Sequence, residues 1–152
     1  MNLFSDIQDD AVLDQSVEPI KFTIIPLQGD LPEFLLKARS CDVAGDQTLD
    51  LARAVHSHSN LVFRGLQAYE GHLVLVKDPV ERAEKIRSAF APLQKTVDLL
   101  ADAGLPAEIV SGGGTGTYDV SGVETPLTEI QAGSYVFMDH TYRAVRPEFA
   151  QA

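Results

Sequence analysis

A glycine-rich segment near the C-terminal end of the 152-residue chain, Ser111-Gly-Gly-Gly-Thr-Gly-Thr117, has the clearest potential for chemistry. It follows the β-branched pair Ile109-Val110, which predicts a loop at the end of a strand. Successive glycines permit positive φ angles and let a ligand approach the backbone closely. Their N–H groups can converge on an anion, with the hydroxyls of Ser111, Thr115 and Thr117 as further donors. We interpret residues 111–118, which end at Tyr118, as a phosphate-binding loop, although the same glycines could serve only to turn the chain. Residues 111–117 are called the glycine loop below.

The glycine loop matches neither common nucleotide signature. A Walker A motif ends in Gly-Lys-Ser/Thr, and the Rossmann pattern spaces its glycines differently. Phosphate sites after the carboxyl end of a parallel strand recur in barrels and in open α/β sheets. On the loop alone, a mononucleotide, a flavin phosphate, a sugar phosphate and pyridoxal phosphate all remain candidate ligands.

The first half of the chain predicts strands and helices in alternation. Residues 20–25 alternate and are β-branched, which predicts a short strand ended by Pro26. Asp46 is expected to cap a helix with apolar residues on one face. Residues 61–69 form a nearly continuous apolar run, typical of a strand buried on both faces.

The clearest predicted element is a long helix that begins at Pro79. Asp78 is the predicted N-cap, Pro79 suits the first helical position, and Glu81 completes a pattern like a capping box. Apolar residues then recur every three or four positions until Gly104 and Pro106 supply a stop signal. After the glycine loop, residues 128–132 and 134–138 are expected to form further strand.

This order predicts an α/β fold built from parallel β/α units, with helices covering the sheet. Three or four such units are about half of a (β/α)₈ barrel of ~250 residues, so we expect a partial barrel. We expect an acidic, mobile lead-in over residues 1–17, the partial barrel over 18–142 and a tail over 143–152.

Composition excludes several classes of function. Twelve basic against 22 acidic residues give a net charge of −10, which argues against a nucleic-acid or anionic-membrane surface. An acidic protein of this kind would bind a phosphate mainly through backbone N–H groups. The single Cys41 cannot form an internal disulfide, and the N-terminus lacks an apolar signal segment. We therefore expect a cytoplasmic protein that does not bind membranes.

Three blocks of the sequence together resemble a known enzyme family. They are Gly65-Leu-Gln-Ala-Tyr-Glu-Gly-His72, Leu105–Tyr118 and Thr128-Glu-Ile-Gln-Ala-Gly-Ser-Tyr-Val-Phe-Met-Asp139. In this order they are similar to the D-threonine aldolase and D-serine dehydratase-like family, pyridoxal-phosphate enzymes of fold type III with an alanine-racemase-like barrel. The resemblance extends from about residue 39 to residue 142 and corresponds to the C-terminal half of that barrel.

The resemblance implies a set of cofactor-binding residues. Gly112, Gly113, Gly114 and Thr115, next to the Ser111 hydroxyl, would hold the cofactor phosphate. Tyr69 would contact the cofactor ring, although an isolated tyrosine at the end of a buried strand is more often a core residue. Arg39 would stand near the phenolic oxygen, although Ser40 and Asp42 depart from the family's Arg-Cys-Gly-Val block. Gln131 and Tyr135 lie in matching blocks and receive no role.

The parts that complete the family's chemistry are missing from the sequence pattern. The family's Schiff-base lysine lies in a block resembling Arg-Pro-His-X-Lys, which this chain lacks. Lys77, Lys85 and Lys95 are expected to be exposed, and Lys21 and Lys37 lie in divergent sequence. The family also uses a divalent metal, whose ligands we do not find here; we read Asp139-His140 as a turn. We therefore assign no catalytic and no metal-binding residue.

Three functions remain open at this point. The first is a pyridoxal-phosphate-dependent lyase that cleaves or dehydrates D-3-hydroxy amino acids, truncated and inactive alone. The second is a non-catalytic remnant with residual phosphate or cofactor binding. The third is a half-enzyme whose partner chain supplies the lysine and the metal site. A partial barrel exposes sheet edges, so self-association or a complementing chain is expected.

Overall fold

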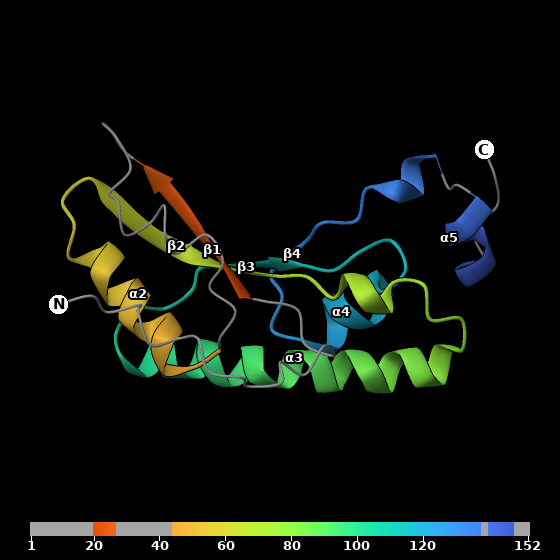
Figure 1. Ribbon diagram of the computed structural model, residues 1–152, viewed down its shortest axis with the longest axis horizontal. Coiled ribbons are helices and arrows are strands. Elements are labelled where there is room, and N and C mark those ends of the chain that lie inside the picture. Colours follow the sequence, from red (N-terminus) through yellow and green to blue (C-terminus); the bar gives the residue numbers. More distant parts are fainter. Residues whose placement is uncertain (1–19, 27–43, 138–139, 148–152) are drawn as a thin grey trace, which may run out of the picture.

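A four-stranded sheet with the order β1-β2-β3-β4 is the centre of the computed structural model, which describes residues 20–26, 44–137 and 140–147. Figure 1 shows α2 and α3 on one side of this sheet. The elements, in chain order, are β1 (Ile20–Pro26), α2 (Asp46–His56), β2 (Leu61–Ala68), the 3₁₀ turn η2 (Gly71–Leu73), α3 (Pro79–Asp102), β3 (Ile109–Gly112), α4 (Tyr118–Glu124), β4 (Glu129–Ile130), the 3₁₀ turn η3 (Ser134–Val136) and α5 (His140–Val145).

The predicted α/β class, with a parallel sheet and covering helices, is confirmed. β2 pairs with β3 and β3 pairs with β4, both in parallel. β1, in contrast, pairs antiparallel with β2, and Pro26 lies beside Leu61. Our expectation of parallel units throughout is therefore wrong for β1. The connection between β1 and β2 begins and ends at the same end of the sheet, whereas parallel strands need a crossover to the opposite end.

Local sequence signals fix the long helix α3 as predicted. Asp78 is its N-cap, and Oδ1 of Asp78 accepts a hydrogen bond of 2.8 Å from the N–H of Glu81. Pro79 is the first helical residue, where its missing N–H leaves no hydrogen bond unmade. The helix ends at Asp102, just before Gly104, which has a positive φ of 75°.

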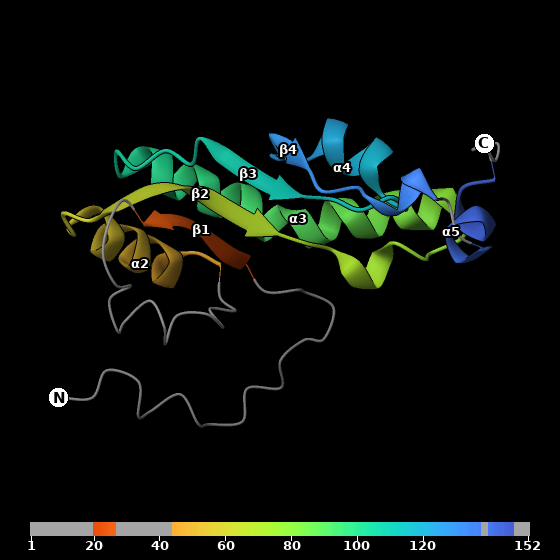
Figure 2. The ribbon, with the colours of Figure 1, turned by 90° about the horizontal axis from the view of Figure 1, so that it is seen from above.

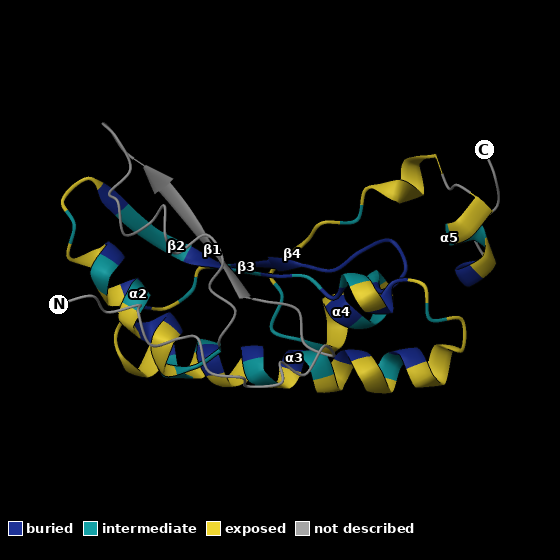
Figure 3. Cartoon of the chain, viewed as in Figure 1, coloured by how far each residue is buried: buried dark blue, intermediate teal, exposed yellow. Residues whose placement is uncertain are grey.

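One face of α3 packs against the sheet and forms the main core. In Figure 2, α3 runs beneath β2 and β3, and Figure 3 shows buried residues on the side of α3 that faces the sheet. Each large apolar side chain buried there contributes roughly 1.5–3 kcal/mol. The core residues from these elements are Leu66, Ile86, Phe90, Leu93, Leu100 and Val110.

The helix α2 joins this core with a different start from the one predicted. Leu49, Ala52 and Val55 are buried on one face, as expected. Asp46, however, is the first helical residue, and the N-cap is Gly45, whose φ of 96° favours glycine. The Gly45 N–H donates to Oγ1 of Thr96 on α3 (3.0 Å), which ties the start of α2 to α3.

The region after the glycine loop differs most from the sequence prediction. β4 contains only Glu129 and Ile130, and residues 134–136 form a 3₁₀ turn where we expected strand. Phe137 is 90% exposed, so this apolar run finds no sheet to join within the described part of the chain. His140 begins α5, so our interpretation of that position as a turn is wrong. The domain boundaries stay predictions, and residues 1–17 lie outside the described ranges.

Candidate phosphate and cofactor site

The glycine loop lies between the carboxyl end of β3 and the start of α4, and all seven of its residues are buried. Because β2, β3 and β4 are parallel, the segments that follow them meet at the same edge of the sheet. Tyr69 directly follows β2, and Gln131 directly follows β4. The topology therefore places Tyr69 and Gln131, one from each of the two other blocks that carry the resemblance, at the same sheet edge as the glycine loop.

All four glycines of the loop, at positions 112, 113, 114 and 116, are required by the backbone conformation or by close packing, as Gly113 and Gly114 illustrate. Gly113 has a φ of 74°, a left-handed conformation that side chains disfavour. A Cβ atom on Gly114 would lie 2.8 Å from Cγ1 of Val74 and 2.9 Å from the hydroxyl oxygen of Tyr69. The structure thus brings the Tyr69 side chain directly against the loop, and its contact with a cofactor stays a prediction.

The four backbone N–H groups of residues 113–116 divide into two pairs. The Gly113 N–H donates to Oε2 of Glu70 (3.2 Å), and the Gly114 N–H donates to Oγ1 of Thr117 (3.0 Å). The N–H groups of Thr115 and Gly116 form no hydrogen bond with any described residue. Buried N–H groups are nearly always paired, so these two are the donors best suited to a bound anion. Sequence reasoning had not singled out Gly116.

The hydroxyls expected to assist the loop have protein partners. The Ser111 hydroxyl donates to Oε1 of Glu129 and accepts from Nε2 of Gln131 (2.8 Å), whose Oε1 accepts from Gln67 (3.1 Å). These side chains form a polar row across β2, β3 and β4. Oγ1 of Thr115 accepts a hydrogen bond of 3.1 Å from the backbone N–H of Tyr135.

An apolar cavity of about 300 Å³ adjoins the loop and is lined by Tyr118, Ile130, Ala132 and Tyr135. Cδ1 of Ile130 lies 3.0 Å from the position of a Cβ on Gly113, so one wall of the cavity is next to the loop. Of these residues, Tyr118 ends the predicted phosphate-binding loop and Tyr135 was noted without a role, whereas Ile130 and Ala132 were not singled out. The two-residue spacing of Ile130 and Ala132 was the available signal, because it places both on one face of an extended segment.

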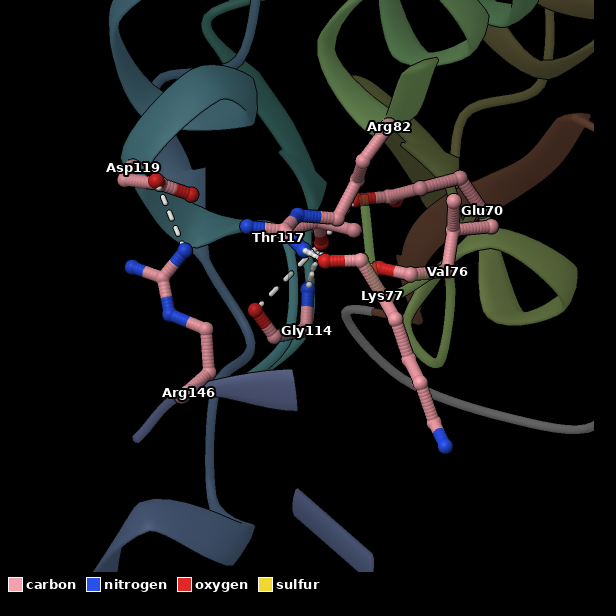
Figure 4. A network of polar contacts seen from close by, with 8 residues as sticks. All are labelled: Glu70, Val76, Lys77, Arg82, Gly114, Thr117, Asp119 and Arg146. Carbon is pink, nitrogen blue, oxygen red and sulfur yellow. Dashed lines mark hydrogen bonds and ion pairs between the residues drawn. The ribbon is translucent and has the colours of Figure 1, made fainter. Parts of the chain in front are cut away.

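Ion pairs hold α4, which carries Tyr118, in place. Arg87 on α3 forms an ion pair with Glu124. The hydrogen bond to Glu124, followed by the charge of Glu124, raises the pKa of Arg87. The hydrogen bond from Arg87 lowers the pKa of Glu124. Arg146 pairs with Asp119 at 2.7 Å, and its guanidinium carbon lies 4.8 Å from the centre of the Tyr118 ring. Figure 4 shows the pair of Arg146 and Asp119. These contacts fix one wall of the cavity.

Other candidate residues do not join the site in the described structure. Arg39 and Lys37 lie outside the described residues. Lys77, Lys85 and Lys95 are exposed, as predicted, and Figure 4 shows the Lys77 side chain extending away from Gly114. Within the described ranges, no three His, Cys, Asp or Glu side chains are grouped to hold a metal ion. No helix in those ranges is both long and apolar enough to cross a bilayer.

Comparison with known proteins identifies relatives of one kind, although no protein-family profile matches the chain. A 3-hydroxy-D-aspartate aldolase of Paracoccus denitrificans (strain Pd 1222) is 38% identical over 97 residues, 64% of this chain and 25% of the relative. A D-threonine aldolase of an Arthrobacter species is 37% identical over 105 residues, 68% of this chain and 28% of the relative.

A solved structure agrees with these sequence matches. The crystal structure of a D-threonine aldolase from Filomicrobium marinum matches with a TM-score of 0.68 and 37% identity. The match covers 74% of this chain and 31% of that protein. The chain therefore spans about a quarter to a third of the length of the proteins it resembles.

Proposed function

We propose, from the chain's homology to 3-hydroxy-D-aspartate aldolase and D-threonine aldolase, that it forms the phosphate-loop part of a pyridoxal-phosphate-dependent lyase. Its substrates would be D-3-hydroxy amino acids, cleaved between Cα and Cβ or dehydrated. The observation that carries this proposal is the pair of buried N–H groups on Thr115 and Gly116, beside an apolar cavity at the carboxyl end of a parallel strand.

The residues present fit a phosphorylated aromatic cofactor. The two N–H groups suit a phosphate, and binding through the backbone suits a protein with a net charge of −10. The neighbouring cavity of about 300 Å³ has the size of a small ligand pocket. Its walls include the Tyr118 and Tyr135 side chains, which suit an aromatic ring.

The chain's own residues would bind and shield the cofactor. Thr115 and Gly116 would donate to the phosphate, and Tyr69 would lie beside the loop at the edge of the cofactor. The apolar walls of the cavity would pack against the cofactor ring. When bound, the cofactor would supply an electron sink for the carbanion that forms at Cα.

We further propose that this chain is inactive alone and that a complementing chain supplies the lysine. Each lysine whose side chain the structure describes, at positions 77, 85 and 95, is exposed. A complementing chain has a surface to cover, because Tyr135, Val136 and Phe137 are 55%, 63% and 90% exposed beyond the short strand β4. A non-catalytic remnant would have the same binding site and no such partner.

Absorbance titration with pyridoxal phosphate tests this function, with pyridoxal as the matched ligand that lacks the phosphate. We expect pyridoxal to bind at least about tenfold more weakly than pyridoxal phosphate, because the missing phosphate removes hydrogen bonds to a charged group. Equal affinities for the two ligands would remove the glycine loop from the proposal. Borohydride reduction should yield no unique lysine adduct in the chain alone, and a unique adduct would contradict its dependence on a partner.

A further inference from the structure

Glu70 is a buried carboxylate for which the proposed function has no role. It stands two residues beyond the end of β2 and is 2% exposed. Three groups donate hydrogen bonds to it. The Gly113 N–H donates to Oε2 (3.2 Å), and the hydroxyls of Thr117 and Ser121 (the latter at 2.6 Å) both donate to Oε1. Figure 4 shows Glu70 beside Thr117.

Burial makes these hydrogen bonds necessary to the fold. A carboxylate taken out of water is strongly destabilising unless donors or a cation compensate it. In the described part of the chain, none of the ion pairs involves Glu70. The compensation therefore comes from the glycine loop and α4, and the loop's conformation depends in turn on the carboxylate.

Glu70 holds two of the backbone N–H groups of the glycine loop, one directly and one through Thr117. Glu70 directly holds the N–H of Gly113, a residue with a left-handed backbone. It also accepts from the Thr117 hydroxyl, and the same oxygen of Thr117 accepts from the Gly114 N–H. The carboxylate thus engages the first pair of N–H groups, directly and through Thr117. The next pair, on Thr115 and Gly116, has no hydrogen bond to a described residue.

We propose that Glu70 is a positioning residue that holds the glycine loop in the conformation that presents Thr115 and Gly116 to a phosphate group. This role rests on the proposed function of the loop. In this role, Glu70 increases the affinity of the loop for an anion. The negative charge of Glu70 alone would lower that affinity, because like charges repel. Whether the affinity falls or rises when the charge of Glu70 is removed therefore separates the two effects.

The variant Glu70→Gln tests the proposal with little change of shape. Glutamine has one acceptor oxygen in place of two, so either the Gly113 N–H or the hydroxyl pair faces an NH₂ donor. Binding of pyridoxal phosphate should weaken roughly tenfold or more, because a hydrogen bond to a charged group is lost. Hydrogen exchange of the Gly113 and Gly114 amides, measured by NMR without ligand, should accelerate by a similar factor.

Two further variants control the experiment. Glu84→Gln makes the same charge change at an exposed position on α3 and should alter neither measurement. Ser121→Ala removes one donor to Oε1 and leaves the acceptor of the Gly113 N–H in place. Slow exchange at Gly113 should therefore persist in Ser121→Ala, which separates this specific contact from a general loosening of the fold.

Two results would overturn the role proposed for Glu70. Unchanged or tighter binding by Glu70→Gln overturns the proposal, as does unchanged exchange at Gly113. If the unaltered chain binds no pyridoxal phosphate, the proposed function fails for this polypeptide. The exchange measurement then still decides whether Glu70 positions the loop: acceleration supports it and an unchanged rate contradicts it.

Discussion

Gly113 and Gly104 offer a matched pair of substitutions that isolates the glycine loop. Their φ angles are 74° and 75°, so alanine at either position adopts the same disfavoured left-handed backbone. This conformation costs about 1–2 kcal/mol for a residue with a Cβ. The reduced freedom of the unfolded chain offsets about 0.4–1 kcal/mol of it. Gly104→Ala adds no contact, because nothing lies within 4 Å of its Cβ position.

Gly113→Ala has the same effect on the backbone and also adds a close contact. Its Cβ would lie 3.0 Å from Cδ1 of Ile130, the end of a side chain that is 37% exposed and can move aside. We therefore expect both variants to lower the free energy of unfolding by about 1 kcal/mol, measured by urea denaturation. Pyridoxal phosphate binding should fall at least about tenfold in Gly113→Ala, because the displaced Ile130 side chain lines the cavity beside the loop, and should be unchanged in Gly104→Ala. Equal affinities of the two variants would refute the assignment of the loop.

Three other substitutions test how the scaffold is held. Asp78→Ala removes the N-cap of α3 and should lower the free energy of unfolding by about 1 kcal/mol in urea denaturation. Thr96→Val leaves the Gly45 N–H without its acceptor inside the protein and should cost about 1–3 kcal/mol in the same assay, with α-helical circular dichroism retained. Glu124→Gln should lower the urea midpoint at neutral pH and have no effect in acid. Arg87 holds the folded-state pKa of Glu124 below its ordinary value, so this stabilisation is present above that value and is lost as the pH falls through the folded pKa. A difference between the unaltered chain and Glu124→Gln that persists in strong acid would contradict this ion pair.

The elements predicted best from the sequence are those fixed by neighbouring residues. The cap at Asp78, the proline at position 79 and the apolar repeat that follows act within a few residues, and α3 forms where they place it. The glycine loop was recognisable for the same reason. The direction of β1 and the 3₁₀ turn at Ser134–Val136 depend on which strand lies beside them, and this information is not local.

The parts of the site that sequence reasoning missed depend on contacts between distant segments. Glu70 follows a buried strand, where a charged residue normally reaches solvent. Its burial results from Gly113, Thr117 and Ser121, more than forty positions away, folding over it. The N–H groups of Gly113 and Gly114 were likewise expected to face a phosphate. Only the folded loop shows that they have partners inside the protein, whereas those of Thr115 and Gly116 do not, within the described residues.

The most direct test of the central claim is an NMR titration of the backbone amides with pyridoxal phosphate, compared with pyridoxal. We predict that the Thr115 and Gly116 amides show the largest shifts with pyridoxal phosphate and much smaller shifts with pyridoxal. Both amides unmoved while the ligand binds elsewhere, or equal shifts with the two ligands, would contradict the claim that this loop holds the phosphate.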